Sequence, residues 1–183
     1  GEIRDMETAE TAVQASLTGH LLFSTVHTNS AAGAIPRFLS IGVKPFLLAP
    51  SLNLVIGQRL VRKLCSNCKK EKELSDEENE KVKQIIDQIP ETEKKDINID
   101  NLKFYEAVGC DQCSNIGYRG RVGIYELLVV NSIIKEMILN GKISEDQIEG
   151  QAREDGMTTM VQDGIIKALK GDTSLAEIFR VID

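Results

Sequence analysis

Over much of the first third of the chain, apolar residues recur at the spacing of an α-helix, with polar residues between them. Residues 5–19 place alanine, valine and leucine on one side and end at a glycine, which predicts a helix. The apolar run at 20–26 is short and contains β-branched residues, which indicates a buried strand. Further helices are expected at 29–42, where Pro36 should kink or split the helix, and at 49–64. This order of elements is typical of the later part of an α/β domain.

The middle of the chain is much richer in charge. Within residues 73–103, Ser75 and Glu78 have the spacing of a capping box at a helix start. A stripe of valine and isoleucine follows and a proline ends it, so we expect an exposed helical insert followed by a loop. Strands are expected on either side of the second cysteine pair, at 103–108 and 121–130.

The last third of the chain has the pattern of short helices. They are expected at 131–141, 144–156, 158–171 and 173–182. Ser144 with Gln147, and Ser174 with Glu177, repeat the spacing of a capping box, and three of the four segments end at a glycine. We expect these helices to form a small bundle without catalytic groups.

The four cysteines of the sequence form two pairs with the same spacing. Cys65 and Cys68 enclose two residues, as do Cys110 and Cys113. Two thiolates on one tight turn offer half of a tetrahedral metal site, and a second turn closes it. A redox couple needs only one pair, and a disulfide framework is expected of short secreted chains. We therefore predict a structural zinc site, with a redox couple or four unrelated thiols as the alternatives.

Composition narrows the classes of function. The 183 residues suffice for one ordinary domain or two small ones, and 42% of them are hydrophobic. A net charge of −6 and an aromatic content of 4% disfavour nucleic-acid binding, which needs basic surface and stacking side chains. The apolar runs are far shorter than a membrane span, and the acidic start has no signal-peptide pattern.

Two polar clusters lie in the first 30 residues. Glu2, Arg4 and Asp5 crowd the stretch GEIRD, whose plainest interpretation is a helix start with acids near the positive end of the dipole. The expected strand at 20–26 ends in a second cluster, which consists of Thr25, His27, Thr28 and Asn29. Polar groups at the carboxyl ends of strands bind ligands in α/β sheets, although a lone histidine there is often a hydrogen-bonded structural residue.

The order of these motifs closely resembles that of the hexameric ATPases of type II secretion and type IV pilus assembly. The resemblance rests on GEIRD at 1–5, STVHTN at 24–29 and both cysteine pairs, in family order. It continues through GMTTMVQDGIIKALKGDTSLAEIFRV, and only about 73–103 departs from it. Related pilus-retraction ATPases generally lack the cysteine pairs, so the assembly or secretion branch is indicated.

The resemblance implies an α/β fold: the C-terminal part of a RecA-like P-loop ATPase core, an inserted tetracysteine zinc subdomain and a C-terminal helical bundle. The expected domains are a partial core at 1–64, the zinc subdomain with its helical insert at 65–125, and the helical subdomain at 126–183. The P-loop pattern GxxxxGK[ST] occurs nowhere in the sequence. We therefore expect a C-terminal fragment that is inactive alone, from a parent that hydrolyses ATP.

The same resemblance assigns roles to the polar residues near the N-terminus. Glu2 matches the Walker B acid and would order Mg²⁺ and its waters at the phosphates of ATP. His27 would contact the γ-phosphate or the catalytic water. The supporting nucleotide and Mg²⁺ contacts would come from Arg4, Asp5, Thr25 and Thr28. For Arg59 and Arg62 the plain expectation is a solvated helix face, and the sequence does not decide whether they act at a subunit boundary.

Partners and location also follow from the resemblance. The parent would be a cytoplasmic homo-hexamer at the inner face of the cell membrane, bound there through an inner-membrane platform protein that the zinc region contacts. It would power pilus extension, secretion or DNA uptake, which the sequence does not distinguish. The alternatives are a non-catalytic zinc-stapled docking module and, disfavoured by charge, a nucleic-acid zinc ribbon.

Overall fold

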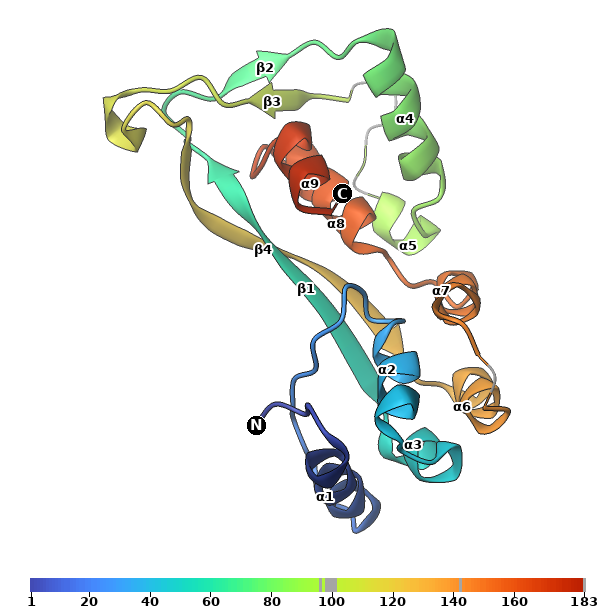
Figure 1. Ribbon diagram of the computed structural model, residues 1–183. Coiled ribbons are helices and arrows are strands. Elements are labelled where there is room, and N and C mark those ends of the chain that lie inside the picture. Colours follow the sequence, from blue (N-terminus) through green and yellow to red (C-terminus); the bar gives the residue numbers. More distant parts are fainter. Residues whose placement is uncertain (96, 98–101, 142, 183) are drawn as a thin grey trace. The chain divides into compact units, whose positions relative to one another are not determined.

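The computed structural model (Figure 1) describes residues 1–95, 97, 102–141 and 143–182. The chain forms two compact units, and each unit is built from two separate segments. Unit 1 comprises Gly1–Gly57 and Leu127–Met157, and unit 2 comprises Gln58–Glu126 and Thr158–Asp183. The chain therefore passes between the units within both of its long strands, which pair with each other in a two-stranded sheet.

Unit 1 is mainly helical. Its helices are α1 (Met6–Leu17), α2 (Ala34–Ile41), α3 (Pro45–Ser51), α6 (Ser132–Leu139) and α7 (Glu145–Glu154). One continuous core joins the two segments of this unit, because Ile35 and Leu48 of the first segment pack in the same cluster as Ile134 and Ile148 of the second. The helix expected at 29–42 begins only at Ala34, so its proline lies in the first turn, where no intrahelical N–H bond is lost.

Unit 2 combines short strands with helices. The long strand β1 (Leu54–Leu64) enters it from unit 1, and β4 (Tyr118–Val129) leads from it back to unit 1. The strand β2 (Lys70–Lys72) pairs antiparallel with β3 (Phe104–Glu106). Its helices are α4 (Asp76–Asp87), α5 (Glu91–Lys94), the 3₁₀ turn η1 (Asp111–Cys113), α8 (Met160–Leu169) and α9 (Leu175–Ile182). All four helices expected in the last third are thus present, two in each unit.

The expected helical insert is present, and most residues of α4 are exposed, while its apolar stripe is buried. Ser75 accepts a hydrogen bond from the backbone N–H of Glu78, whose carboxylate accepts one from the N–H of Ser75, so the capping box is confirmed. Val82 and Ile86 are buried in one cluster with the apolar faces of α8 and α9. The apolar stripe therefore docks the insert into the core of unit 2. Part of the loop expected after it lies outside the described residues.

The helix expected at 49–64 is wrong, because a strand replaces most of it. After α3 ends at Ser51, β1 runs from Leu54 to Leu64 with nearly alternating exposure. Apolar residues at 55, 56 and 60 fit a helical spacing. The segment nevertheless pairs with β4 as a strand, whose exposed face carries Ile56 and Leu60.

The buried strand expected at 20–26 is also wrong. Within the described residues, this segment forms one isolated parallel bridge, between Thr25 and Glu2. Its large apolar side chains face solvent, with Leu21 83% and Phe23 84% exposed. A strand is buried only where neighbouring elements cover it, and the described residues provide no such cover here. None of the described helices has the length and apolar composition needed to span a membrane.

Candidate functional site

The four cysteines meet in unit 2, at the ends of its strands. Cys65 directly follows β1 and Cys68 precedes β2. Between β3 and β4, Cys110 directly precedes the single turn η1 and Cys113 ends it. The backbone N–H of Cys65 donates to the carbonyl oxygen of Gly117 (2.9 Å), which ties the first cysteine loop to the second. Pairs that are distant in the sequence therefore form one cluster.

The sulfur atoms of this cluster have the spacing of a tetrahedral metal site. All four lie within 4.8 Å of one another, and the Cys65–Cys110, Cys68–Cys113 and Cys110–Cys113 separations are 3.9, 3.8 and 3.8 Å. Four sulfurs at about 2.3 Å from a central zinc ion would be about 3.8 Å apart. A disulfide needs about 2.05 Å, and all four cysteines are free. The cluster can hold a metal ion and contains no disulfide.

Hydrogen bonds to sulfur favour thiolates in this cluster. Cys113 Sγ accepts from the backbone N–H groups of Cys110 and Gly117, both at 3.2 Å. The side-chain amide of Asn67 donates to Cys110 Sγ at 3.4 Å and lowers the pKa of this thiol to about 6. Burial instead raises the pKa of Cys68 to about 11. A bound cation would offset the burial of negatively charged sulfur atoms, which fits the donor set to a divalent metal.

Gly117 gives the second cysteine loop its tight path. Its φ is +79°, a value that L-residues with a side chain rarely adopt. A Cβ on this residue would lie 2.6 Å from the Cβ of Ala107, a contact that is sterically impossible. The glycine thus permits the close approach that brings its N–H to Cys113 Sγ.

Glu2 is the centre of a second polar cluster, in unit 1. Its carboxylate contacts Arg4 at 2.5 Å and Nε2 of His27 at 2.8 Å. The bridge to Thr25, with a hydrogen bond of 2.8 Å from Ile3 N–H to the Thr25 carbonyl, aligns the two segments that carry these residues. The hydrogen bond from Arg4 lowers the pKa of Glu2 against the opposing effect of burial. Glu2 is therefore an ionised carboxylate with a histidine ring beside it, and that ring is 89% exposed.

The remaining polar residues in these motifs have local partners. Asp5 caps α1 by accepting a hydrogen bond of 2.9 Å from Thr8 N–H, which also lowers its pKa. Thr28 donates to the carbonyl of Ser30 at 2.8 Å, and the hydroxyl of Ser30 donates to the carboxylate of Glu145 in the first turn of α7. No local pattern in the sequence pointed to this last contact.

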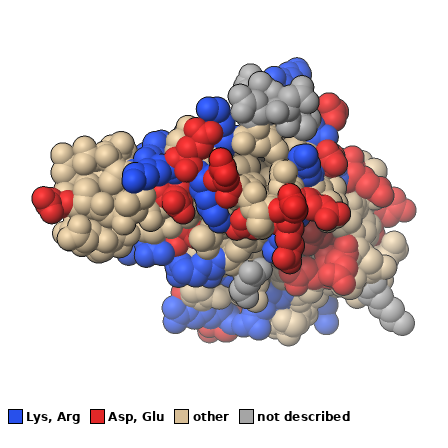
Figure 2. Space-filling view, turned by 90° about the horizontal axis from the view of Figure 1, so that it is seen from above, with Lys and Arg blue, Asp and Glu red and all other residues tan. Residues whose placement is uncertain are grey.

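The two arginines before the first cysteine pair lie on β1, so the solvated helix face considered for them is excluded. Arg62 pairs with the buried Glu177 of α9, a partner that sequence reasoning assigned only to a capping box. Figure 2 shows lysine and arginine side chains mixed with aspartate and glutamate over much of one face, whereas the left end of this view has few charged side chains.

The sequence that carries these two centres matches the model of a known family. The chain belongs to the type II/IV secretion system proteins, whose family model matches residues 1–180. It is 47% identical over 181 residues to the type IV pilus assembly ATPase PilB of Pseudomonas aeruginosa and 45% identical over 181 residues to the type II secretion system protein E of Aeromonas hydrophila. The predicted resemblance to secretion and pilus assembly ATPases is confirmed.

The similarity covers this chain almost completely but its relatives only in part. It spans 99% of the chain in both cases, but 30% of the PilB protein and 33% of the protein E. The chain thus spans about a third of the length of the curated relatives it matches. The ATPases DotB of Legionella pneumophila and Yersinia pseudotuberculosis share its fold, with TM-scores of 0.58 and 0.60 at 18% and 16% identity. They cover 98% of this chain, which covers 36% and 35% of theirs.

Proposed function

We propose that this chain is the C-terminal part of a hexameric ATPase motor that couples ATP hydrolysis to pilus or pseudopilus assembly or to protein secretion. The observation that carries the proposal is the ionised Glu2, held by Arg4 and in contact with His27. Relatives named as secretion and pilus assembly ATPases support the reaction class. The chain would contribute these residues to a RecA-like core, while the P-loop would come from a segment of the parent that precedes Gly1.

The cluster around Glu2 suits phosphoryl transfer, which requires positioned charge and an oriented water more than a covalent group. In the parent, ATP would supply the phosphoryl group and Mg²⁺ would neutralise its charge. Glu2 would then hold the waters of the metal ion, because its lowered pKa keeps it ionised. His27 would orient towards the γ-phosphate or the attacking water, while Arg4 holds the carboxylate in place. Thr25 aligns the two segments through its backbone, Thr28 shapes the loop after His27, and Asp5 would act mainly through the start of α1.

For the four cysteines we propose structural zinc. A closed set of four sulfurs leaves no coordination position for a substrate, so the metal would stabilise the fold and would not catalyse. We further propose that the parent is cytoplasmic, lies at the inner face of the cell membrane and docks there on an inner-membrane platform protein through the cysteine region.

Replacement of Glu2 tests the catalytic assignment. In a longer protein that joins this chain to a P-loop segment, Glu2→Gln should lower the rate of ATP hydrolysis by at least about 100-fold while hexamers still assemble. The matched control is Glu7→Gln in the first turn of α1, an exposed residue that should leave the rate unchanged. Normal hydrolysis by the Glu2→Gln protein would refute the assignment. The chain of 183 residues alone should hydrolyse no ATP.

A non-catalytic docking module remains the second candidate, because the cysteine cluster is built entirely within unit 2. Metal analysis should find one zinc ion per chain. If the longer protein binds zinc and its membrane partner but never hydrolyses ATP, docking is the better description.

A further inference from the structure

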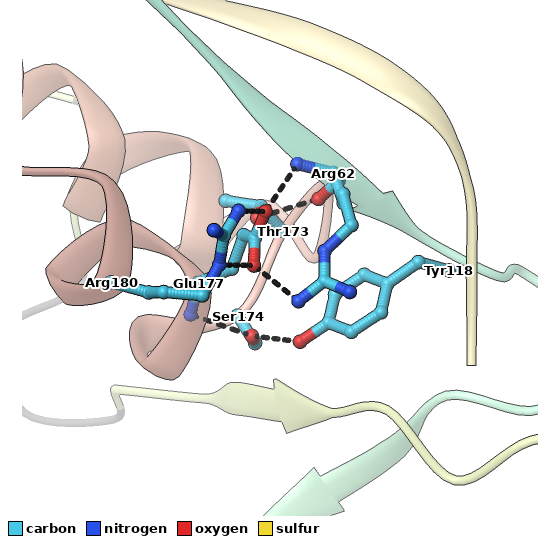
Figure 3. A network of polar contacts seen from close by, with 6 residues as sticks. All are labelled: Arg62, Tyr118, Thr173, Ser174, Glu177 and Arg180. Atoms are coloured by element: carbon cyan, nitrogen blue, oxygen red, sulfur yellow. Dashed lines mark hydrogen bonds and ion pairs between the residues drawn. The ribbon is translucent and has the colours of Figure 1, made fainter. Parts of the chain in front are cut away.

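The carboxylate of Glu177 is the centre of a buried polar network in unit 2 (Figure 3). Its side chain is 0% exposed. It accepts hydrogen bonds from the backbone N–H and the guanidinium of Arg62, at 3.0 and 2.6 Å, and two from Arg180, at 2.8 and 2.7 Å. Burial alone would raise the pKa of Glu177, but the two arginines outweigh it and lower the pKa to about 2. α9 thus holds the end of β1 through a charged group with four donors.

A second set of contacts fastens the same strand end to the loop before α9. The hydroxyl of Thr173 donates to the carbonyl of Arg62 at 2.8 Å, and Leu64 N–H donates to the carbonyl of Asp172 at 2.9 Å. On β4, the hydroxyl of Tyr118 lies 2.7 Å from that of Ser174. The ring of Tyr118 also lies under the guanidinium of Arg62, as Figure 3 shows, with 4.3 Å between the guanidinium carbon and the ring centroid.

The end of β1 and the start of β4, which these contacts hold, lie next to the four-cysteine site. Cys65 follows Leu64 directly, and its backbone N–H donates to Gly117, the residue before Tyr118. Gly117 in turn donates to Cys113 Sγ at 3.2 Å. Cys65 is therefore three residues from Arg62, and Cys113 accepts a hydrogen bond from the residue next to Tyr118. One cysteine of each pair is thus closely linked to the network around Glu177.

A third fastening lies on the other side of the first cysteine pair. The ammonium group of Lys69, the residue after Cys68, donates to the carbonyl of Gly171 at 2.8 Å, and it lies 4.8 Å from the ring centroid of Tyr105. Gly171 follows the end of α8, where a cation interacts favourably with the helix dipole. The loop 170–174 and α9 thus contact both arms of the first cysteine loop.

We propose that Glu177 is a positioning residue for the four-cysteine site, so that docking of α9 and retention of the metal are coupled. The inference rests on the metal assignment made under the proposed function. With Glu177 in place, the end of β1 is fixed against α9, and Cys65 stands at the correct distance from the second pair. Coupling between two such events is reciprocal, because each must strengthen the other by the same free energy.

The competing explanation is a purely structural role at the helix start. Glu177 N–H does donate to the hydroxyl of Ser174 at 3.2 Å, as in the predicted capping box. The carboxylate of Glu177, however, is directed to the two arginines. If Glu177 served only the helix, its loss would loosen α9 and leave metal release unchanged.

Metal release distinguishes these roles. We would load the chain with zinc and measure transfer of zinc to a chromogenic chelator in excess, for the wild type, Glu177→Gln and Glu71→Gln. Glu71 lies on β2 in an exposed ion pair with Lys103. Its replacement makes the same change of charge close to the four-cysteine site and leaves the contacts of Glu177 intact. Removal of a residue that orients metal ligands typically weakens binding 10- to 100-fold, so Glu177→Gln should release zinc about tenfold faster and Glu71→Gln at the wild-type rate.

Hydrogen exchange tests the reciprocal arm. Removal of zinc from the wild-type chain should increase exchange at the backbone N–H groups of Arg62, Leu64 and α9. Equal rates of zinc release from the wild type and Glu177→Gln would overturn the proposal. So would equal rates of hydrogen exchange in α9 with and without zinc. If Glu177→Gln does not fold, Tyr118→Phe replaces it: it keeps the ring under Arg62, loses the bond to Ser174 and should release zinc about threefold faster.

These measurements need no nucleotide, so their failure is separable from failure of the proposed motor function. A wild-type chain that binds no zinc would overturn both the metal assignment and the coupling, while the assignment of Glu2 would stand.

Discussion

The two polar centres of this chain differ in how completely their own unit surrounds them. In unit 2, the cysteine cluster and Glu177 draw every described partner from the same unit, and the carboxylate is fully buried. In unit 1, Glu2 is held by Arg4, yet the ring of His27 is almost fully exposed, and the neighbouring segment 20–26 exposes large apolar side chains. The first centre is thus complete within the chain, whereas the second would need further groups for catalysis.

The apolar cores of the two units differ in the same direction. Unit 1 has one continuous cluster that joins both of its segments. The core of unit 2 is divided into two smaller clusters, one around Ile86 and Ile178 and one around Val61 and Ile124. A smaller core supplies less free energy of folding. We therefore expect loss of the metal to destabilise unit 2 much more than unit 1.

Loss of the metal should therefore give the largest effect. Apparent binding free energies of structural zinc in small peptides are about 10–16 kcal/mol. Cys113→Ser removes one ligand and should therefore unfold the region around the four-cysteine site. Hydrogen exchange should rise to the unprotected rate in β2, β3 and η1, while α1 and α3 keep their protection. The control is Ser66→Ala, at an exposed position of the first cysteine loop. Equal loss of protection in both units would contradict the comparison.

A cavity in the core of unit 2 should have the next largest effect. Ile86 of α4 is 0% exposed and packs in the cluster shared with α8 and α9. Ile86→Ala should lower the free energy of unfolding of unit 2 by about 2–5 kcal/mol, measured by denaturant titration of the zinc-loaded chain. Ile85→Ala, on the neighbouring and only half-buried position, should cost clearly less. Equal costs would mean that the insert is not docked.

The features of this fold with local determinants could be predicted from the sequence. The capping boxes at Ser75 and Ser144 and the paired cysteines lie within a few residues, so spacing alone revealed them. Features whose partners are distant could not. Arg62 and Glu177 are 115 residues apart, and nothing in either local pattern connects them. The apolar residues of β1 have a helical spacing, and only pairing with the distant β4 makes this segment a strand.

The pH dependence of unit 2 should reveal the charge on Glu177. Its folded pKa of about 2 lies below the ordinary value of 4.5, so its contribution to stability is full above about pH 4.5 and is lost as the pH falls towards 2. The contribution is on the order of 3 kcal/mol. Glu177→Gln lacks it, so the unfolding free energies of wild type and variant should converge over this window. Acid also protonates the thiolates and releases zinc, and the proposed coupling makes the variant release it more readily, so both proteins are compared without zinc. A constant difference would contradict the assignment.

The smallest expected effect lies in unit 1, at the contact between Ser30 and Glu145. The hydroxyl of Ser30 accepts from Gly33 N–H at 3.0 Å while it donates to the carboxylate, so Glu145→Ala should loosen residues 28–33 by about 1 kcal/mol. The change also removes an acid from the first turn of α7, which weakens the helix by itself. Asp146→Ala removes an acid from the same turn and leaves the contact with Ser30 intact. Hydrogen exchange at Gly33 should therefore rise in the first variant and not in the second. Equal exchange in both variants would mean that the helix dipole, and not this contact, accounts for the effect, and the loop after His27 would then be independent of α7.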